Sequence, residues 1–225
     1  MTDDPRSPLE LLEALTVQEV EIAPGLRHLE IYTLRGLLTL LWHGPADADR
    51  ALVTVGGGMG SLLGPADGLY HDLGVRFAAH GIATIRVGYR KPNDLSRCVH
   101  DMAAAADLAG RRGVRRFVTM GHSFGGAVAI QTGAVLGTHC RGVVTLSTQS
   151  AGCEVASELG KTPLLLFHGD ADEILPPETS AVVQMLAGHG EIVVFPGAGH
   201  LLSEASDEIR DRLDEWIPAH LGLAE

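Results

Sequence analysis

The sequence lacks several features that would place it in other protein classes. It has only three cysteines, Cys98, Cys140 and Cys153, and their irregular spacing excludes a disulfide framework and a four-thiolate zinc site. No apolar run approaches the roughly 18 to 20 residues that span a bilayer, so we expect no transmembrane helix and no membrane partner. The first residues are acidic where a secretory signal is basic, and no apolar stretch follows them. We therefore expect a cytoplasmic protein.

Basic residues are also scarce. The chain has 17 Lys and Arg against 28 Asp and Glu, a formal net charge of −11. Such a surface repels polyanions, so we expect no nucleic-acid partner. Hydrophobic residues are 45% and charged residues 20% of the chain, which excludes an intrinsically disordered or fibrous protein. The 225 residues are enough to bury a full core in one domain.

The spacing of apolar residues predicts the order of strands and helices. Stretches at 16–23, 26–34 and 37–42 predict an antiparallel beginning to a sheet. From residue 51, short apolar runs alternate with segments of helical length, as in βα units on a parallel sheet. The runs are 51–55, 82–87, 116–120, 142–147, 163–168 and 191–195. The predicted helices are 68–80, 94–112, 124–136, 177–187 and 202–220.

These elements predict one α/β domain over residues 17–225. We expect a mostly parallel, eight-stranded sheet with helices on both faces, and no insertion is long enough to form a cap domain. Residues 1–16 are an N-terminal extension. In it, Leu9, Leu11, Leu12 and Leu15 allow a small amphipathic helix that covers a sheet edge or meets a second subunit, so a homodimer stays open.

A nucleophile motif lies between the predicted strand at 116–120 and the helix at 124–136. It reads Gly121-His122-Ser123-Phe124-Gly125, a G-x-S-x-G pattern. A sharp turn that lifts a serine off a sheet needs small residues two positions before and after it, and this motif supplies glycine at both. The sequence therefore predicts Ser123 as a nucleophile.

The partners of a nucleophilic serine follow in the chain. A serine needs a base, and the base needs an orienting carboxylate. Asp170 and Asp172 follow the run at 163–168, and His200 follows the run at 191–195. Open parallel sheets collect their sites at this end of the strands, and the order serine, acid, histidine is typical of this topology. On this ground alone both acids remain candidates.

With these motifs the sequence resembles the α/β-hydrolase superfamily, and its short, capless length resembles the dienelactone hydrolase-like and small carboxylesterase branches. The resemblance implies the α/β-hydrolase fold. His168, Gly169 and Asp172 match the family's H-G-x-x-D segment, which implies Asp172 as the acid. Dienelactone hydrolases proper carry a cysteine where this chain has Ser123, so dienelactone itself is not implied as a substrate.

A glycine-rich loop at residues 56–61 matches the family's loop after the third strand, with glycine in place of the usual histidine. Acyl transfer needs two backbone N–H groups aimed at the developing oxyanion. We expect Phe124 and Gly58 to supply them, with Met59 as the alternative to Gly58. The loop fits no phosphate-binding motif, since it lacks the lysine of a P-loop and the spacing of G-x-G-x-x-G.

Two further features have competing interpretations. No metal-ligand spacing occurs among the histidines, so we expect no metal site, and packing accounts for His122 and His168. Tyr89, Arg90 and Lys91 follow the run at 82–87, at the same sheet edge as the serine. We expect the two cations either to contact a substrate carboxylate or to pair with local acids.

The expected reaction is hydrolysis of a small-molecule ester or thioester without a cofactor. Ser123 attacks the carbonyl, His200 takes its proton, and Asp172 holds the imidazole. A thioesterase or acyltransferase on the same site, and a non-catalytic binding module of the same fold, are the alternatives. Because no cap is expected, we predict a preference for acyl chains of about two to six carbons.

Overall fold

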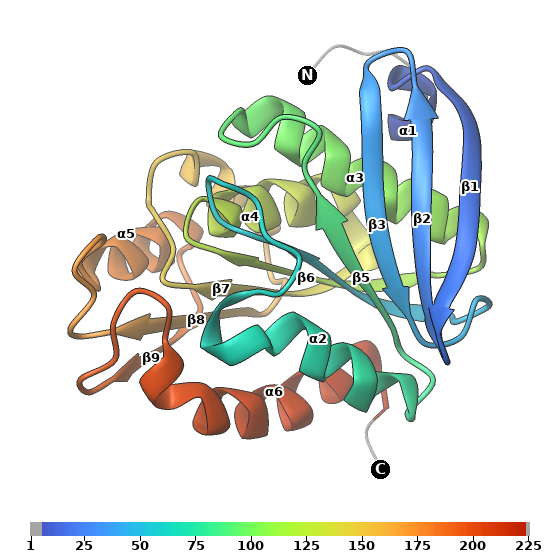
Figure 1. The fold of residues 1–225 in the computed structure, drawn as a ribbon. Coiled ribbons are helices and arrows are strands. Elements are labelled where there is room, and N and C mark those ends of the chain that lie inside the picture. The colour runs from blue at the N-terminus through green and yellow to red at the C-terminus, as the bar shows by residue number, and fades with distance from the viewer. Residues whose placement is uncertain (1–5, 224–225) are drawn as a thin grey trace.

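The apolar runs of the sequence form a single nine-stranded sheet in the computed structural model, which describes residues 6–223 (Figure 1). The strand order is β1-β2-β3-β5-β4-β6-β7-β8-β9. The strands are β1 (Ala14–Ala23), β2 (Leu26–Thr33), β3 (Gly36–His43), β4 (Arg50–Val55), β5 (Ala83–Gly88), β6 (Arg116–His122), β7 (Cys140–Leu146), β8 (Leu164–Gly169) and β9 (Glu191–Phe195). Strands β4 to β9 are parallel, whereas β1, β2 and β3 pair antiparallel and β3 joins β5 antiparallel.

The mostly parallel α/β sheet was expected, but the expected number of strands, eight, was wrong. Every predicted apolar run forms a strand, including the alternating stretch at the edge, so the sheet has nine. All ten residues of the edge strand β1 are exposed. This strand is held by its ladder with β2 and not by burial of its side chains.

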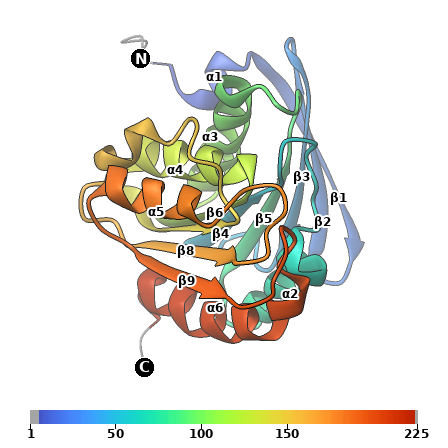
Figure 2. The same ribbon diagram turned by 90° about the vertical axis from the view of Figure 1, so that its left-hand side faces the viewer.

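Helices cover both faces of the sheet (Figures 1 and 2). α2 (Pro65–Ala78) and α6 (Ser206–Leu221) lie on one face, and α3 (Leu95–Arg111), α4 (Phe124–Leu136) and α5 (Glu178–Ala187) lie on the other. Each face has its own buried apolar cluster, with Leu69 and Ile209 in one and Met102 and Ile130 in the other. Within residues 6–223, no inserted segment forms a cap domain, and no helix is long and apolar enough to cross a bilayer.

Two helices begin elsewhere than predicted because residues near their starts have positive φ. α2 is assigned from Pro65, before the predicted residue 68, but Ala66, Asp67 and Gly68 have left-handed φ of 49°, 58° and 88°, so its right-handed part starts only after Gly68. α6 begins at Ser206 and not at residue 202, because Leu202 has a φ of 58° and a short 3₁₀ turn follows it.

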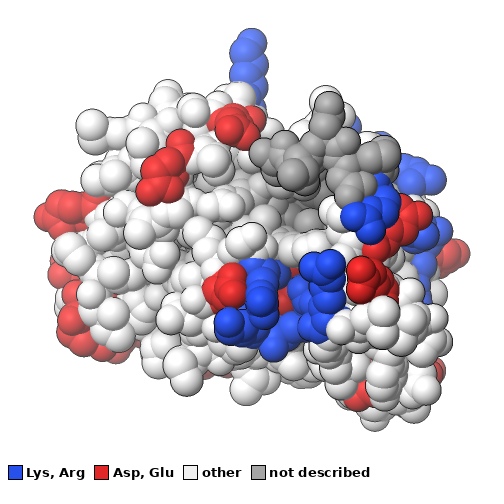
Figure 3. Space-filling view, turned by 90° about the horizontal axis from the view of Figure 1, so that it is seen from above, with Lys and Arg blue, Asp and Glu red and all other residues white. Residues whose placement is uncertain are grey.

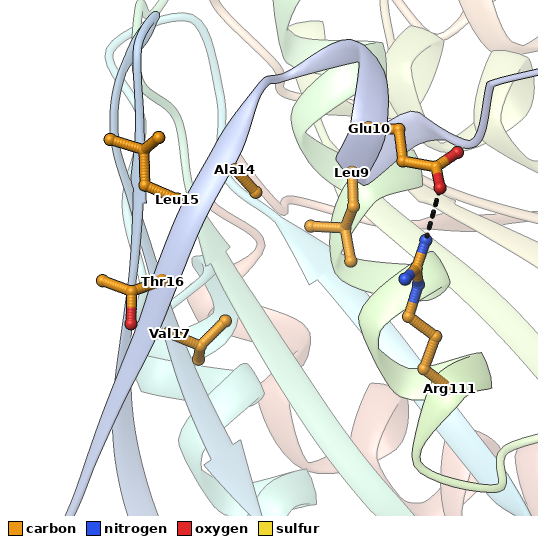
Figure 4. Close-up of a pocket in the computed structure, with 7 residues that line it drawn as sticks. All are labelled: Leu9, Glu10, Ala14, Leu15, Thr16, Val17 and Arg111. Atoms are coloured by element: carbon orange, nitrogen blue, oxygen red, sulfur yellow. Dashed lines mark ion pairs between the residues drawn. The ribbon is translucent and has the colours of Figure 1, made fainter.

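The N-terminal extension forms the short helix α1 (Pro8–Leu11), which packs against α3. The backbone N–H of Leu9 donates to Asp107 at 3.1 Å, and Glu10 lies 3.9 Å from Arg111. Figure 4 shows this pair beside a cavity of about 250 Å³ between α1, β1 and α3. Residues 8–11 thus pack onto the domain, and β1 begins at Ala14, within the segment predicted as an extension.

Candidate active site

Ser123 occupies a strained turn between β6 and α4. Its φ of 57° and ψ of −120° lie outside the regions that residues with a side chain usually adopt. A Cβ on Gly121 would lie 1.8 Å from the carbonyl oxygen of Gly125, and one on Gly125 would lie 2.3 Å from that of Gly56. Both motif glycines are therefore required by the close approach of backbones, as the motif predicted.

The glycine-rich loop after β4 lies against this turn. β4 and β6 are neighbours in the sheet, so the loops that follow them leave its edge together. A Cβ on Gly57 would lie 3.7 Å from the Cβ of Ser123, and one on Gly58 would lie 3.8 Å from the Cβ of Phe124. The side chain of Met59 points away, with 93% of its surface exposed. The glycine-rich loop and the serine turn therefore lie side by side at this edge of the sheet.

Two tyrosines hold the start of this loop. The Tyr89 hydroxyl donates to the carbonyl of Gly56 at 2.9 Å, and the Tyr70 hydroxyl donates to that of Val55 at 2.8 Å. The Tyr89 ring also meets the ring of Phe124 edge-on, with centroids 6.2 Å apart. Tyr89 therefore contacts both the start of the glycine-rich loop, by its hydroxyl, and Phe124 of the serine turn, by its ring.

Asp172 and His200 meet where the loops after β8 and β9 extend from the same edge of the sheet (Figure 2). Nδ1 of His200 lies 2.7 Å from Oδ2 of Asp172, and because a carboxylate accepts, Nδ1 carries the proton. Oδ1 of Asp172 accepts the backbone N–H groups of Ile174 and Leu175, each at 2.8 Å. The other candidate acid, Asp170, instead accepts the N–H of Gly197 at 2.6 Å.

These contacts keep the Asp172 carboxylate ionised. Burial alone would raise the pKa of Asp172, but hydrogen bonds from the backbone of Leu175, from His200 and from the backbone of Ile174 outweigh it and lower the pKa below its ordinary value. The side chain has no exposed surface. A fixed negative charge therefore lies beside Nδ1 of His200.

A second imidazole, that of His168, also lies beside Asp172 and was not predicted to do so. Its Nε2 is 3.2 Å from Oδ2 of Asp172 and 3.0 Å from the carbonyl oxygen of Leu175, while Nδ1 is 2.7 Å from the Ser180 hydroxyl. Because the carbonyl accepts, Nε2 donates and Nδ1 accepts from Ser180. His168 is thus held beside the acid by its own hydrogen bonds to Leu175 and Ser180. Its place in the H-G-x-x-D segment was the available signal.

Glu173 also supports the histidine loop and was missed by the sequence analysis. Its Oε2 accepts the backbone N–H of His200 at 3.3 Å. A Cβ on Gly199 would lie 3.2 Å from the same oxygen. Glu173 therefore holds the backbone of the loop, while Asp172 holds the ring.

His122 links the serine turn to the histidine loop. Its Nε2 donates to the carbonyl oxygen of His200 at 3.0 Å, and the two rings lie 4.8 Å apart. A Cβ on Gly57 would lie 3.5 Å from Nδ1 of His122. Burial lowers the pKa of His122 to about 4, so the ring is neutral near pH 7. The buried His122 ring thus lies between the serine turn, the histidine loop and the glycine-rich loop.

The two cations after β5 are engaged with acids of this chain. The guanidinium of Arg90 forms an ion pair with Asp101, and its backbone N–H donates to the same carboxylate at 2.9 Å. Lys91 lies 3.6 Å from Asp94. Both cations line a cavity of about 440 Å³ with Arg35, Arg97 and His100. Figure 3 shows Lys and Arg gathered on the face seen from above, with acidic side chains between and beside them. The Arg90–Asp101 pair is buried, so the charge of Arg90 is already neutralised.

Comparison with known proteins identifies the fold. No family model matches the chain. Acyl-protein thioesterase 1 of Gibberella zeae is 30% identical over 115 residues, and a probable carboxylesterase of Oryza sativa subsp. japonica is 32% identical over 132. The matched regions cover 46% and 55% of this chain, and the chain spans about half of each relative, 49% and 54%.

The solved structure of a dienelactone hydrolase from Anabaena variabilis is similar over nearly the whole chain. The match covers 92% of this chain and 100% of that structure, with a TM-score of 0.73 at 17% sequence identity. The chain has the α/β-hydrolase fold.

Proposed function

We propose that this chain is a serine hydrolase that cleaves a carboxylic ester or thioester through an acyl-enzyme intermediate. The observation that carries the proposal is the pairing of Asp172 with His200, whose loop is hydrogen-bonded through His122 to the strained turn of Ser123. A relative named a thioesterase and another named a carboxylesterase support the same reaction class. Both names denote the transfer of an acyl group to water.

The protonation of His200 suits it to act as the base. Because Nδ1 donates its proton to Asp172, the neutral ring has its lone pair on Nε2. In the proposed mechanism Nε2 takes the proton of the Ser123 hydroxyl as the oxygen attacks the carbonyl carbon, and then gives it to the leaving alkoxide or thiolate. Water repeats the sequence on the acyl-enzyme and releases the acid.

The oxyanion is held by the backbone in this proposal. The N–H of Phe124 begins α4, where the helix leaves its first N–H groups unpaired and its dipole favours negative charge. Gly58 lies beside Phe124 and is the second proposed donor, with Met59 as the alternative one residue later. All of these groups belong to the chain itself, so the reaction uses no cofactor.

The proposal is tested by hydrolysis of p-nitrophenyl butyrate and of the matching butyryl thioester. We expect turnover of at least one of them, and Ser123→Ala lowers kcat by about 10³ or more because the serine and the histidine act as a unit. The matched control is Ser157→Ala, at an exposed position far along the chain, with activity like the native protein. If Ser123→Ala kept more than about a tenth of the activity, the nucleophile would be another group.

The same assay separates the alternatives. An acyltransferase would release little acid and would pass the butyryl group to an added alcohol or thiol in preference to water. A binding module of this fold would turn over neither substrate.

A further inference from the structure

A hydrogen bond between two buried side chains joins the ends of the loop that carries Asp172. This loop, residues 170–177, connects β8 to α5, and we call it the acid loop. His168 lies near the end of β8, and Ser180 lies in the first turn of α5. The Ser180 hydroxyl is 2.7 Å from Nδ1 of His168, and neither residue has exposed surface. This pair therefore closes the acid loop at its base.

A continuous series of hydrogen bonds connects the pair to the acid. The Ser180 hydroxyl donates to Nδ1 of His168, and Nε2 of His168 donates to the carbonyl of Leu175 at 3.0 Å. The backbone N–H of Leu175 in turn donates to Oδ1 of Asp172 at 2.8 Å. Oδ2 of the same carboxylate accepts Nδ1 of His200 at 2.7 Å. The series thus runs from α5 to the histidine of the proposed mechanism.

Burial makes the Ser180 hydroxyl important to the His168 ring. A neutral imidazole has one donor and one acceptor nitrogen, and here the acceptor is Nδ1. Without the hydroxyl, Nδ1 would be a buried polar atom without a partner, which costs free energy. The ring could regain a partner only by turning or by moving its proton to Nδ1. Either change takes the donated proton away from the carbonyl of Leu175 and releases the acid loop on that side.

We propose that Ser180 and His168 are positioning residues that hold Asp172 where its carboxylate orients His200. This inference rests on the proposed function and adds two residues to its machinery. Both act through the acid loop, because neither has exposed surface with which to contact a substrate. A displacement of about 1 Å in a catalytic group can lower a rate by about 10²-fold, so small movements of this loop matter. The proposal revises the expectation that packing alone accounts for His168.

The first test removes the hydroxyl. We expect Ser180→Ala to lower kcat for p-nitrophenyl butyrate about 10-fold with KM nearly unchanged, because the variant disturbs the orientation of His200 and not the contacts to substrate. Ser180→Thr keeps a hydroxyl and should recover most of kcat. The matched control is Thr119→Val, which removes a buried hydroxyl of β6 that donates to the carbonyl of Ala129 at 2.9 Å. It should lower the stability of the chain without lowering kcat.

A double-mutant cycle tests whether Ser180 acts through His168. His168→Phe keeps a ring but has no nitrogen to accept the hydroxyl proton. In this background Ser180→Ala should therefore change kcat less than about 2-fold, since the partner through which it acts is gone. If Ser180→Ala lowered kcat about 10-fold in both backgrounds, Ser180 would act by another route and the proposal would be wrong.

A measurement without substrate separates this proposal from the proposed function. The proton on Nδ1 of His200, assigned as the low-field ¹H NMR signal that His200→Ala removes, reports the hydrogen bond to Asp172. We expect the signal to move upfield in Ser180→Ala and to stay in place in Thr119→Val. An unmoved signal, or native kcat, in Ser180→Ala would overturn the proposal. If the native chain hydrolysed neither ester nor thioester, the proposed function would fail, and the signal would still show whether Ser180 positions Asp172.

Discussion

At the scale of single residues, removing the charge of Asp172 tests whether this carboxylate is the acid that orients His200. In Asp172→Asn, the amide that faces Nδ1 of His200 no longer holds the ring in the tautomer that leaves Nε2 free. We expect kcat for ester hydrolysis to fall by about 10³ to 10⁴. Asp170→Asn is the matched control, since that carboxylate accepts only a loop N–H of Gly197, and it should lower kcat less than about 10-fold. A reversal of the two effects would move the acid to Asp170.

His122 offers a second test at this scale. His122→Phe keeps a ring but loses the donor to the His200 carbonyl, so we expect kcat to fall about 10-fold with KM nearly unchanged, since a hydrogen bond of this kind contributes about 1.5 kcal/mol. His122→Gln retains an N–H donor and should recover most of kcat. Equal activity of the two variants would show that His122 only fills space.

At the scale of secondary-structure elements, the close contact between two backbones explains why the turn that carries Ser123 needs glycine. In Gly125→Ala the new Cβ meets the backbone of Gly56, which no side-chain rotation relieves. We expect the free energy of unfolding to fall by about 3 kcal/mol, measured by urea denaturation. Gly110→Ala in α3 is the control: a Cβ there has nothing within 4 Å, and a helical alanine should stabilise the protein by up to about 1 kcal/mol. If both variants were equally stable, the close backbone contact would not exist.

Much of the element pattern could be predicted, because short apolar runs between helical segments determine a parallel sheet locally. The helix over 124–136 was predicted with both ends as observed, since Ser123 precedes it and Gly137 follows. The starts of α2 and α6 could not be predicted. They depend on a long-range hydrogen bond, from the N–H of Ala66 to the carbonyl of Leu201, and on positive φ values that the sequence does not indicate.

Dependence on long-range contacts also limits what could be predicted of the site from the sequence. The serine, acid and histidine lie in recognisable motifs, and the structure brings Asp172 to His200. The carboxylate that neutralises Arg90 is Asp101, inside α3, and nothing in the sequence pairs the two. His168 lay within a recognised motif, but its distance from Asp172 depends on the path of the loop and not on residue type.

At the scale of the whole molecule, buried histidines predict how stability depends on pH. Burial lowers the pKa of both His122 and His43 to about 4. Between pH 6.5 and 4 the unfolded chain therefore binds protons that the folded chain does not, so the free energy of unfolding falls as pH falls. His122 alone should contribute a loss of about 3 kcal/mol across this window, and its stabilising effect is fully present above pH 6.5.

Urea denaturation at several pH values from 4.5 to 7 measures this effect. We expect His122→Gln to show a shallower decline than the native chain, because the titrating group is gone while His43 remains. His80→Gln, at an exposed position, serves as the control and should follow the native decline. A His122→Gln curve parallel to the native one would show that the His122 ring is not buried in its neutral form.

The central claim, that Ser123 is an activated nucleophile, is tested most directly by reaction with a fluorophosphonate followed by peptide mapping. The serine oxygen displaces fluoride from phosphorus, and only a serine with a base beside it does so readily. We predict one phosphonyl group per chain, on Ser123, with ester hydrolysis lost in parallel and labelling slowed about 10³-fold or more in His200→Ala. No adduct, an adduct at another residue, or equally fast labelling of His200→Ala would contradict the account.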